Sequence, residues 1–190
     1  MLEKNLKEHM ACFQDLFELE ALIENAANLL TACVQQGGKI MSCGNGGSAA
    51  DSQHFAAEIV CRFYRDRIAL PAISLTTDTS IMTATANDDT FTHIFSRQIE
   101  ALSRPDDMLI ALSTSGSSKN IVQAVKTAQE RQIPVIVLTG AGGGSLSSMA
   151  DVAIQVPSNN TPRIQEAHIF ILHYWAERIE ASICHQKDAT

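Results

Sequence analysis

Basic side chains are in the minority in this chain of 190 residues. It carries 14 lysines and arginines against 21 aspartates and glutamates, which leaves a formal net charge of -7 at pH 7. A nucleic-acid backbone or an anionic membrane surface is held by clustered positive charge. We therefore expect neither nucleic acid nor a membrane among its main partners.

Long apolar runs are also missing. No stretch approaches the ~18–20 consecutive apolar residues that a membrane-spanning helix requires. The N-terminal residues, Met1–Lys4, lack the basic-then-apolar layout of a secretory signal. These two absences predict a cytoplasmic protein.

Closely spaced cysteine pairs are absent as well. Five cysteines are scattered along the chain, namely Cys12, Cys33, Cys43, Cys61 and Cys184, and no two of them form a CxxC pair. The pattern therefore favours neither a thiolate zinc site nor a disulfide framework. Cys43 adjoins a glycine-rich loop, but no base lies beside it in the sequence to activate it as a nucleophile. We predict reduced, mostly buried thiols.

What the chain does contain is a regular alternation of apolar runs and helical stretches. Five near-continuous apolar runs predict strands at 39–43, 71–75, 108–112, 135–138 and 152–156. Amphipathic stretches between them predict helices over 49–63, 91–103 and 118–131. Strands of this kind, separated by helices, are typical of a parallel sheet covered on both faces.

The length and this pattern predict one α/β domain over 1–190. Its α/β core spans 37–160. Residues 1–36, with apolar side chains at helical spacing, form an N-terminal helical region, and 161–190 form a C-terminal helix.

The first predicted strand leads into a glycine-rich segment, Gly44–Asp51. Three glycines in four positions allow a ligand to approach the backbone closely, and Ser48 is placed to cap the following helix. The segment lacks the third glycine of the dinucleotide fingerprint and the GK[ST] of the P-loop. On these residues alone, a tight turn and a ligand-binding loop remain equally open.

A second loop, Ser113–Ser118, is dense in hydroxyl groups and directly precedes a predicted helix. Backbone N–H groups at a helix N-terminus bind a phosphate dianion without needing a basic patch. We therefore predict a phosphate site here. Such a site reconciles an acidic protein with an anionic ligand.

Two helical segments carry candidate acid, base and metal-binding groups. His54 and Glu58 are four residues apart, so their side chains lie one above the other on one helix face. Gln165, His168 and His173 form a second polar cluster in an apolar segment, where such histidines are often satisfied core residues. Gln165 and His173 are separated by about 12 Å along a straight helix. Convergence on one ion would need long side-chain reach or ligands from two subunits.

Together these features resemble the sugar isomerase (SIS) domain family along nearly the whole chain. The segments that carry the resemblance are Ser42–Ser48, Gln53–Glu58, Ala86–Asp88, Phe95–Gln98, Ser113–Gly116 and Arg163–Glu166. The resemblance implies a flavodoxin-like α/β fold with a five-stranded parallel sheet flanked by helices, and with added N- and C-terminal helices.

The family resemblance also implies roles for individual residues. The implied sugar-phosphate contacts are Asn45, Gly46, Gly47, Ser48, Glu58, Arg62, Asn87, Asp88, Ser113, Thr114, Ser115, Ser118 and Gln165. The implied ligands of one Zn²⁺ per subunit are His54, Glu58, Gln165 and His173. Glu58 and His173 match the base and the acid of the family's proton transfer. The family implies a homotetramer with active sites at subunit contacts.

The resemblance is to members that isomerise a seven-carbon sugar phosphate. It implies conversion of sedoheptulose 7-phosphate to D-glycero-D-manno-heptose 7-phosphate through a cis-enediol, the first step towards ADP-heptose for the lipopolysaccharide core. The alternative is a non-enzymatic SIS scaffold that binds the bacterial replication initiator. Glu58 and His173 favour the enzyme, because a scaffold has no physical need for either group. A SIS regulator that senses a sugar phosphate is disfavoured by the acidic N-terminal region.

Overall fold

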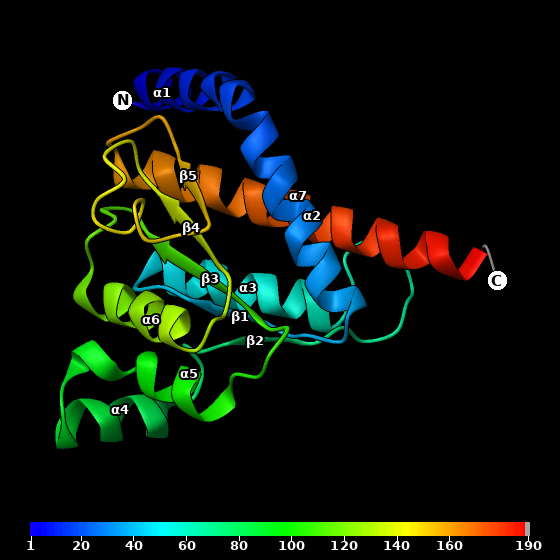
Figure 1. Cartoon of the computed structure of the whole chain (residues 1–190). Coiled ribbons are helices and arrows are strands. Elements are labelled where there is room, and N and C mark those ends of the chain that lie inside the picture. The colour runs from blue at the N-terminus through cyan, green and yellow to red at the C-terminus, as the bar shows by residue number, and fades with distance from the viewer. Residues whose placement is uncertain (189–190) are drawn as a thin grey trace.

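The computed structural model describes residues 1–188 and contains a five-stranded sheet between two layers of helices (Figure 1). The strands are β1 (Ile40–Cys43), β2 (Ala72–Ser74), β3 (Met108–Ser113), β4 (Val135–Thr139) and β5 (Val152–Gln155). The α-helices are α1 (Leu2–Asp15), α2 (Glu20–Gln35), α3 (Gly47–Val60), α4 (Thr79–Asp88), α5 (Ser96–Leu102), α6 (Lys119–Glu130) and α7 (Thr161–Asp188). Residues 1–188 also contain two 3-10 turns, η1 (Leu16–Leu19) and η2 (Phe91–His93).

All strand pairs are parallel, and the strand order is β2-β1-β3-β4-β5. This is the order of flavodoxin-like doubly wound sheets. Every residue of β1, β3 and β4 is buried, which is why these strands read as apolar runs without alternation. The predicted five-stranded parallel sheet and its flanking helices are confirmed.

The pleat of the sheet sends alternate side chains into two separate cores. Ile110 and Leu112 of β3 face the core formed with α2, α3 and α7, whereas Leu109 and Ala111 face the core formed with α5 and α6. Trp175 of α7 is fully buried in the first core. Its indole N–H donates to the carbonyl of Ile23 at 3.0 Å and so ties α7 to α2.

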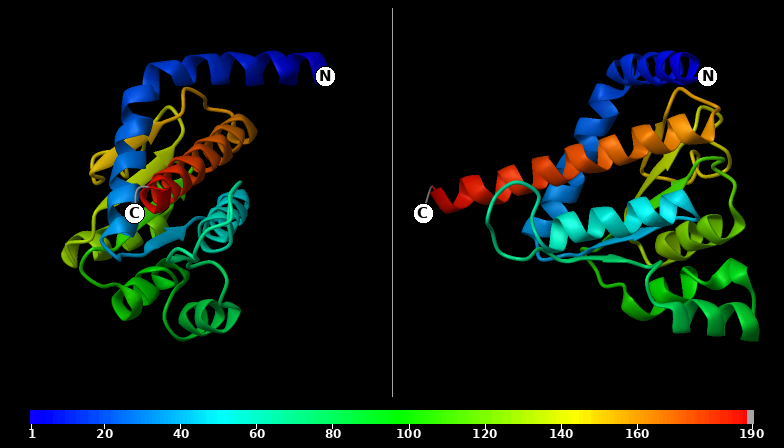
Figure 2. Two further views of the ribbon diagram at one scale, coloured as in Figure 1. Left: turned by 90° about the vertical axis from the view of Figure 1, so that its right-hand side faces the viewer. Right: turned by 180° about the vertical axis from the view of Figure 1, so that it is seen from behind.

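Helices α1 and α7 extend beyond this body of a sheet and two helical layers. Figure 2 shows α1 projecting from the body and α7 running alongside α3 and then beyond the sheet. Cys12 is the buried residue of α1, and apolar side chains such as Leu6 and Met10 are exposed. Within residues 1–188, none of the helices combines the length and the apolarity that a membrane crossing requires.

Several local predictions need correction. The helix expected over 91–103 is a 3-10 turn at 91–93 followed by α5 at 96–102, and the helix expected over 49–63 spans 47–60. Helix α4 was not predicted. It begins after Asp78, whose Oδ1 accepts from the N–H of Ile81 at 2.8 Å. None of its residues is fully buried, although Met82 and Ala86 pack in part against the second core.

Ser48 was wrongly predicted to cap α3. The residue before the helix is Gly46, whose φ of 57° starts the turn without a side-chain cap. Ser48 therefore lies inside the first helical turn, where its N–H donates to the carbonyl of Asn45 at 3.0 Å. Of the C-terminal helix expected over 161–190, residues 189 and 190 lie outside the described part of the chain. The division into three regions stays a proposal.

Candidate active site

Three titratable side chains converge where α3 and α7 pack side by side. The Nε2 atoms of His54 and His173 are 2.8 Å apart, and His54 Nε2 lies 3.2 Å from Glu58 Oε1. One ligand atom from each of the three residues lies within 4.8 Å of the others. The i, i+4 spacing on α3 places His54 and Glu58 on the same face, and α7 supplies His173 from 115 or more residues away in sequence, since 173 − 58 = 115.

The environment of His173 favours its neutral form. Burial lowers the pKa of His173 and the neighbouring His54 lowers it further, while the Glu58 carboxylate acts in the opposite direction. A neutral imidazole offers a free nitrogen lone pair, either to a proton or to a metal ion.

The donor set also fits a divalent transition metal. Two imidazole nitrogens and one carboxylate oxygen are a common zinc ligand set that leaves a coordination position open for a substrate. The Nε2 atoms of His54 and His173 lie close enough for a small outward movement to place both of them on one ion. The three residues therefore fit a catalytic metal site by their chemistry and their convergence.

The amide of Gln165, the fourth predicted metal ligand, lies at the N-terminal end of α3. Its side-chain amide packs against Gly47 at the start of α3, so closely that a Cβ on Gly47 would lie 2.6 Å from Gln165 Nε2. Gly47 lies seven residues before His54, and Gln165 lies eight residues before His173. Within one chain, His54, Glu58 and His173 form the cluster, and the Gln165 amide packs at the N-terminal end of α3.

The predicted phosphate loop, 113–118, lies at the carboxyl edge of the sheet and leads into α6. The hydroxyl of Ser113 donates to that of Ser118 at 3.1 Å, and α6 begins at Lys119, so its N-terminal N–H groups and its dipole face this loop. Gly116 adopts a φ of 64° and is packed directly on Gly143, where a Cβ would lie 2.1 Å from the carbonyl oxygen. The backbone of a second loop thus supports the hydroxyl-rich loop.

The glycine-rich loop and the hydroxyl-rich loop are joined by a pair of amides. The Asn45 amide donates to Asn120 Oδ1 at 2.9 Å, and the Asn120 amide donates back to Asn45 Oδ1 at 2.8 Å. Asn120 is buried. Because β1 and β3 are adjacent and parallel, their carboxyl ends meet and bring these two predicted substrate loops together.

Three further predicted substrate contacts are exposed and bind neighbouring side chains of the same chain. Arg62 follows α3 and pairs with Asp66 at 2.8 Å in an exposed position. The Asn87 amide donates to Asp88 Oδ1 at 2.8 Å at the exposed end of α4. Figure 1 places α4 on the opposite side of the sheet from α7. The structure therefore does not bring Asn87 and Asp88 to the triad of the same chain.

Two residues that the sequence offered as candidates for a chemical role, His168 and Cys43, are structural. His168 is fully buried, its Nε2 lies 3.2 Å from the carbonyl oxygen of Thr139, and burial lowers its pKa to about 4. Burial raises the pKa of Cys43 to about 12, so its thiol is protonated and unreactive. All five cysteines are free, as predicted, although Cys61 is exposed.

A family model described as the SIS domain matches residues 6–140, which is more than half of the chain. The chain belongs to the SIS domain family.

Within this SIS family, the chain is similar to proteins named phosphoheptose isomerase. It is 49% identical to the one from Rhodospirillum rubrum over 173 residues, covering 91% of this chain and 92% of that protein. It is 47% identical to the one from Campylobacter jejuni over 180 residues, covering 95% of this chain and 97% of that protein. The structure of phosphoheptose isomerase from Neisseria gonorrhoeae superposes with a TM-score of 0.90 at 43% identity, over 95% of this chain and 97% of that one.

Sequence reasoning missed three buried polar residues of this SIS domain. Asn120 joins the two substrate loops, and its only sequence signal is its place at the start of the helix after the hydroxyl-rich loop. Arg67 and Glu180 form a buried ion pair beside the triad, with 3.3 Å between Arg67 Nε and Glu180 Oε1. They are 113 positions apart, since 180 − 67 = 113, so no local pattern could have paired them.

Proposed function

We propose that this SIS-domain protein is a phosphoheptose isomerase, which converts sedoheptulose 7-phosphate to D-glycero-D-manno-heptose 7-phosphate for lipopolysaccharide heptose. The observation that carries the proposal is the convergence of Glu58 and His173 beside His54, with ligand atoms within 4.8 Å of one another. The similarity to proteins of that name over nearly the whole chain supports the same reaction.

The chemistry requires a proton to leave the carbon beside a carbonyl and a proton to reach the adjacent carbon. Glu58 takes the proton from C1 of the ketose and returns it to C2 through a cis-enediol, as a positioned carboxylate can. His173, kept neutral by its lowered pKa, carries a proton between the two oxygens. The loops 44–48 and 113–118 hold the sugar phosphate by backbone N–H groups and hydroxyls.

We infer that the triad holds Zn²⁺, one per subunit, with Gln165 as the fourth predicted ligand. Bound there, the ion would supply Lewis-acid polarisation of the substrate carbonyl. A carboxylate cannot serve fully as a metal ligand and as a base at the same time, so the two roles of Glu58 compete. Activity that is lost on chelation and restored by zinc would support the metal role, whereas full activity of the metal-free protein would exclude it.

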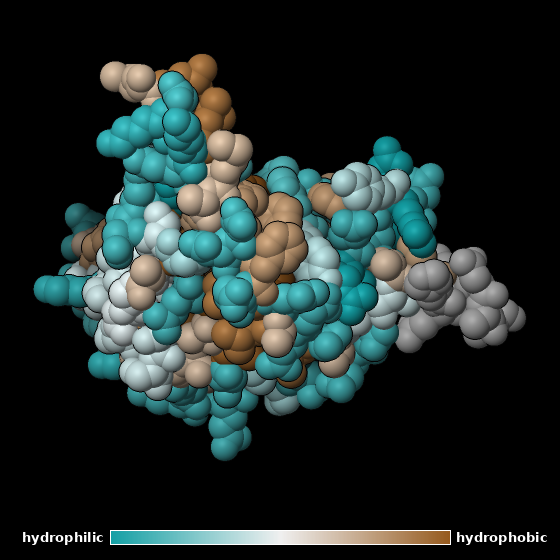
Figure 3. Space-filling model, turned by 90° about the horizontal axis from the view of Figure 1, so that it is seen from above, coloured by the Kyte–Doolittle hydropathy of each residue, from teal (hydrophilic) through white to brown (hydrophobic). Residues whose placement is uncertain are grey.

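The proposed assembly is a homotetramer whose active sites lie at subunit contacts. An apolar groove of about 430 Å³ runs between α1, α2 and α7, lined by Phe13, Gln14, Leu16, Phe17, Glu20, Ile23, Glu24, Phe170 and Tyr174. Figure 3 shows apolar surface gathered beside the projecting α1. Within one chain, α4, which ends with Asn87 and Asp88, lies on the opposite side of the sheet from α7, and a neighbouring copy offers a way to complete the site. We place the enzyme in the cytoplasm, where phosphorylated sugars are made and kept.

Proton NMR of sedoheptulose 7-phosphate with zinc-supplemented protein in D₂O tests the reaction. New aldose signals, or deuterium entering beside the carbonyl, would establish isomerisation and show that a base reaches that carbon. An unchanged spectrum with folded, metal-loaded protein would overturn the proposal. Binding to the replication initiator would then be measured, because a SIS scaffold is the remaining alternative.

A further inference from the structure

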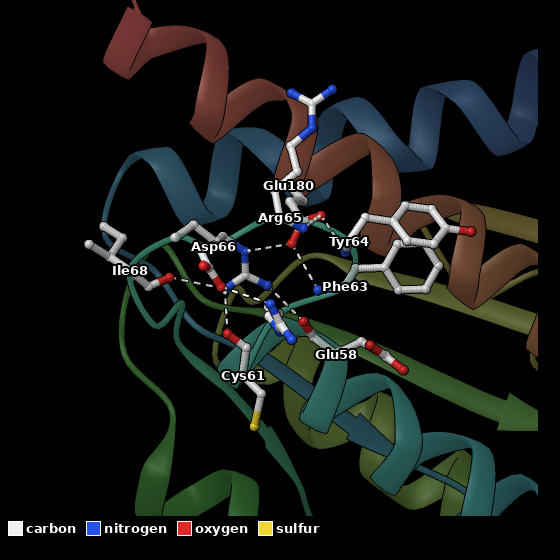
Figure 4. A network of polar contacts seen from close by, with 10 residues as sticks. Glu58, Cys61, Phe63, Tyr64, Arg65, Asp66, Ile68 and Glu180 are labelled. Carbon is white, nitrogen blue, oxygen red and sulfur yellow. Dashed lines mark hydrogen bonds and ion pairs between the residues drawn. The ribbon is translucent and has the colours of Figure 1, made fainter.

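A buried carboxylate on α7 anchors the loop that follows α3. Glu180, whose side chain is 2% exposed, accepts hydrogen bonds from three consecutive backbone N–H groups, those of Phe63, Tyr64 and Arg65, at 2.8, 2.7 and 2.9 Å (Figure 4). Burial alone would raise the pKa of Glu180, but these three hydrogen bonds and the Arg67 guanidinium together hold it below its ordinary value. The carboxylate is therefore charged and fully engaged.

The same loop supplies the counter-ion, which binds back to the end of α3. The side chain of Arg67 is 1% exposed, and its Nε lies 3.3 Å from Glu180 Oε1. Its two terminal nitrogens donate to backbone carbonyls, one to Glu58 at 2.7 Å and the other to Ile68 at 3.0 Å and Cys61 at 3.5 Å. The last carbonyls of a helix have no partner within the helix, and a cation there also complements the helix dipole.

This ion pair joins the two helices that carry the proposed acid and base. Glu180 lies seven residues beyond His173, two turns along the same face of α7. The guanidinium of Arg67 donates to the backbone carbonyl of Glu58 itself. A second connection runs through Phe63. Its N–H is held by Glu180, and its ring centroid lies 5.8 Å from that of His173.

Stability alone gives little reason for this arrangement. A buried ion pair costs so much desolvation that well-packed apolar residues usually stabilise a fold equally well. What apolar residues cannot do is hold three amide N–H groups on one side and three carbonyls on the other in a defined geometry.

We propose that Arg67 and Glu180 are positioning residues that set the separation between Glu58 and His173. The proposal rests on the catalytic roles proposed above for Glu58 and His173. The ion pair then determines turnover more than phosphate binding, because the loops proposed to hold the phosphate lie at the N-terminal ends of α3 and α6.

Two variants test the proposal, Glu180→Gln and Arg67→Lys. The glutamine keeps the size but offers one acceptor oxygen where the carboxylate offers two, and the lysine keeps the charge but loses the fork that reaches several carbonyls. We expect kcat to fall by roughly 10- to 100-fold in each, since small displacements of reacting groups have effects of this size. We expect KM to stay within about twofold of the wild-type value. Neither substitution removes a phosphate contact, and such contacts are equally strong in the ground state and the transition state.

The matched control is Asp107→Asn, directly before the central strand β3. Asp107 is also a buried carboxylate, accepts from the N–H groups of Lys39 and Arg104 at 2.9 and 2.7 Å, and pairs with the Lys39 ammonium. Asp107→Asn should lower the melting temperature of the protein as Glu180→Gln does, but it should leave kcat unchanged. Equal loss of kcat in the control would reduce the role of Glu180 to general stability and would overturn the proposal.

A second readout is independent of substrate. In ¹H–¹⁵N spectra of the imidazole rings, the His54 and His173 signals should move in Glu180→Gln and Arg67→Lys and stay in place in Asp107→Asn. Unmoved signals, or wild-type kcat in a folded variant, would overturn the positioning role. If Glu180→Gln does not fold, Arg67→Lys decides alone. If the wild-type protein itself gives no turnover, the proposed function fails, and these spectra still decide whether the pair positions the two helices.

Discussion

Glu58 is the residue on which the chemistry depends most, because it is the one carboxylate of the triad found between α3 and α7. Replacement by glutamine keeps the shape and the contact with His54 but removes the group that accepts a proton. We expect Glu58→Gln to lower kcat by about 100- to 10,000-fold, the usual contribution of a general base. Steady-state rates together with size-exclusion chromatography measure this. A correctly assembled variant with near wild-type turnover would remove Glu58 from the mechanism.

The buried His168 leads to a prediction about how the stability of the fold depends on pH. Its pKa is lowered to about 4 in the fold, from 6.5 in its unperturbed state, so the folded protein favours the neutral ring. The unfolded chain binds a proton first as the pH falls. The contribution of the neutral ring is therefore fully present above pH 6.5 and is lost progressively between pH 6.5 and 4.

The replacement His168→Gln tests this, because an amide keeps a donor towards the Thr139 carbonyl but does not titrate. In the wild type, the free energy of unfolding should lose on the order of 3 kcal/mol from this residue as the pH falls from 6.5 to 4. Urea unfolding at a series of pH values should give a flatter dependence for the variant than for the wild type. Parallel curves would show that His168 titrates normally in the fold. Carboxylates titrate in the same range in both proteins and cancel in the difference.

At the scale of elements, the sequence predicts what is buried much better than what is exposed. The strands were predictable because β1, β3 and β4 bury every residue and so read as apolar runs. Helix α4 was not, since it buries none of its residues and is started by the Asp78 cap. The His54–Glu58 pair followed from helical spacing alone, but its union with His173 depends on how α7 crosses α3. Only the family resemblance indicated that.

The loop before α6 offers a prediction about an element. A Cβ on Gly116 would lie 2.1 Å from the Gly143 carbonyl oxygen, and the residue has a φ of +64°. Gly116→Ala must therefore move the 113–118 loop, and we expect a loss of roughly 1–3 kcal/mol in the free energy of unfolding. Weaker sugar-phosphate binding should follow, seen as a higher KM. Gly142→Ala is the matched control, because a Cβ there has nothing within 4 Å. A wild-type KM in Gly116→Ala would separate this loop from the phosphate.

At the scale of the whole molecule, the exposed apolar surface must be reconciled with the acidic composition. The N-terminal helix exposes Leu2, Leu6 and Met10 at four-residue spacing, and Phe17 is 76% exposed beside the groove between α1, α2 and α7. Contiguous apolar surface of this kind marks an interaction site. A second copy of the chain is the occupant that the proposed tetramer supplies.

Phe17→Asp tests this assembly. A charge in the centre of an apolar contact cannot be paired there, so light scattering should show species smaller than a tetramer. Turnover should fall with assembly, because sites at subunit contacts are incomplete in a lone chain. Leu102→Asp is the control, since Leu102 is an apolar residue of α5, 38% exposed and remote from the groove; it should leave both assembly and turnover intact. A fully active monomer of Phe17→Asp would show that each chain carries a complete site, and that Gln165, Asn87 and Asp88 act from where the single chain places them.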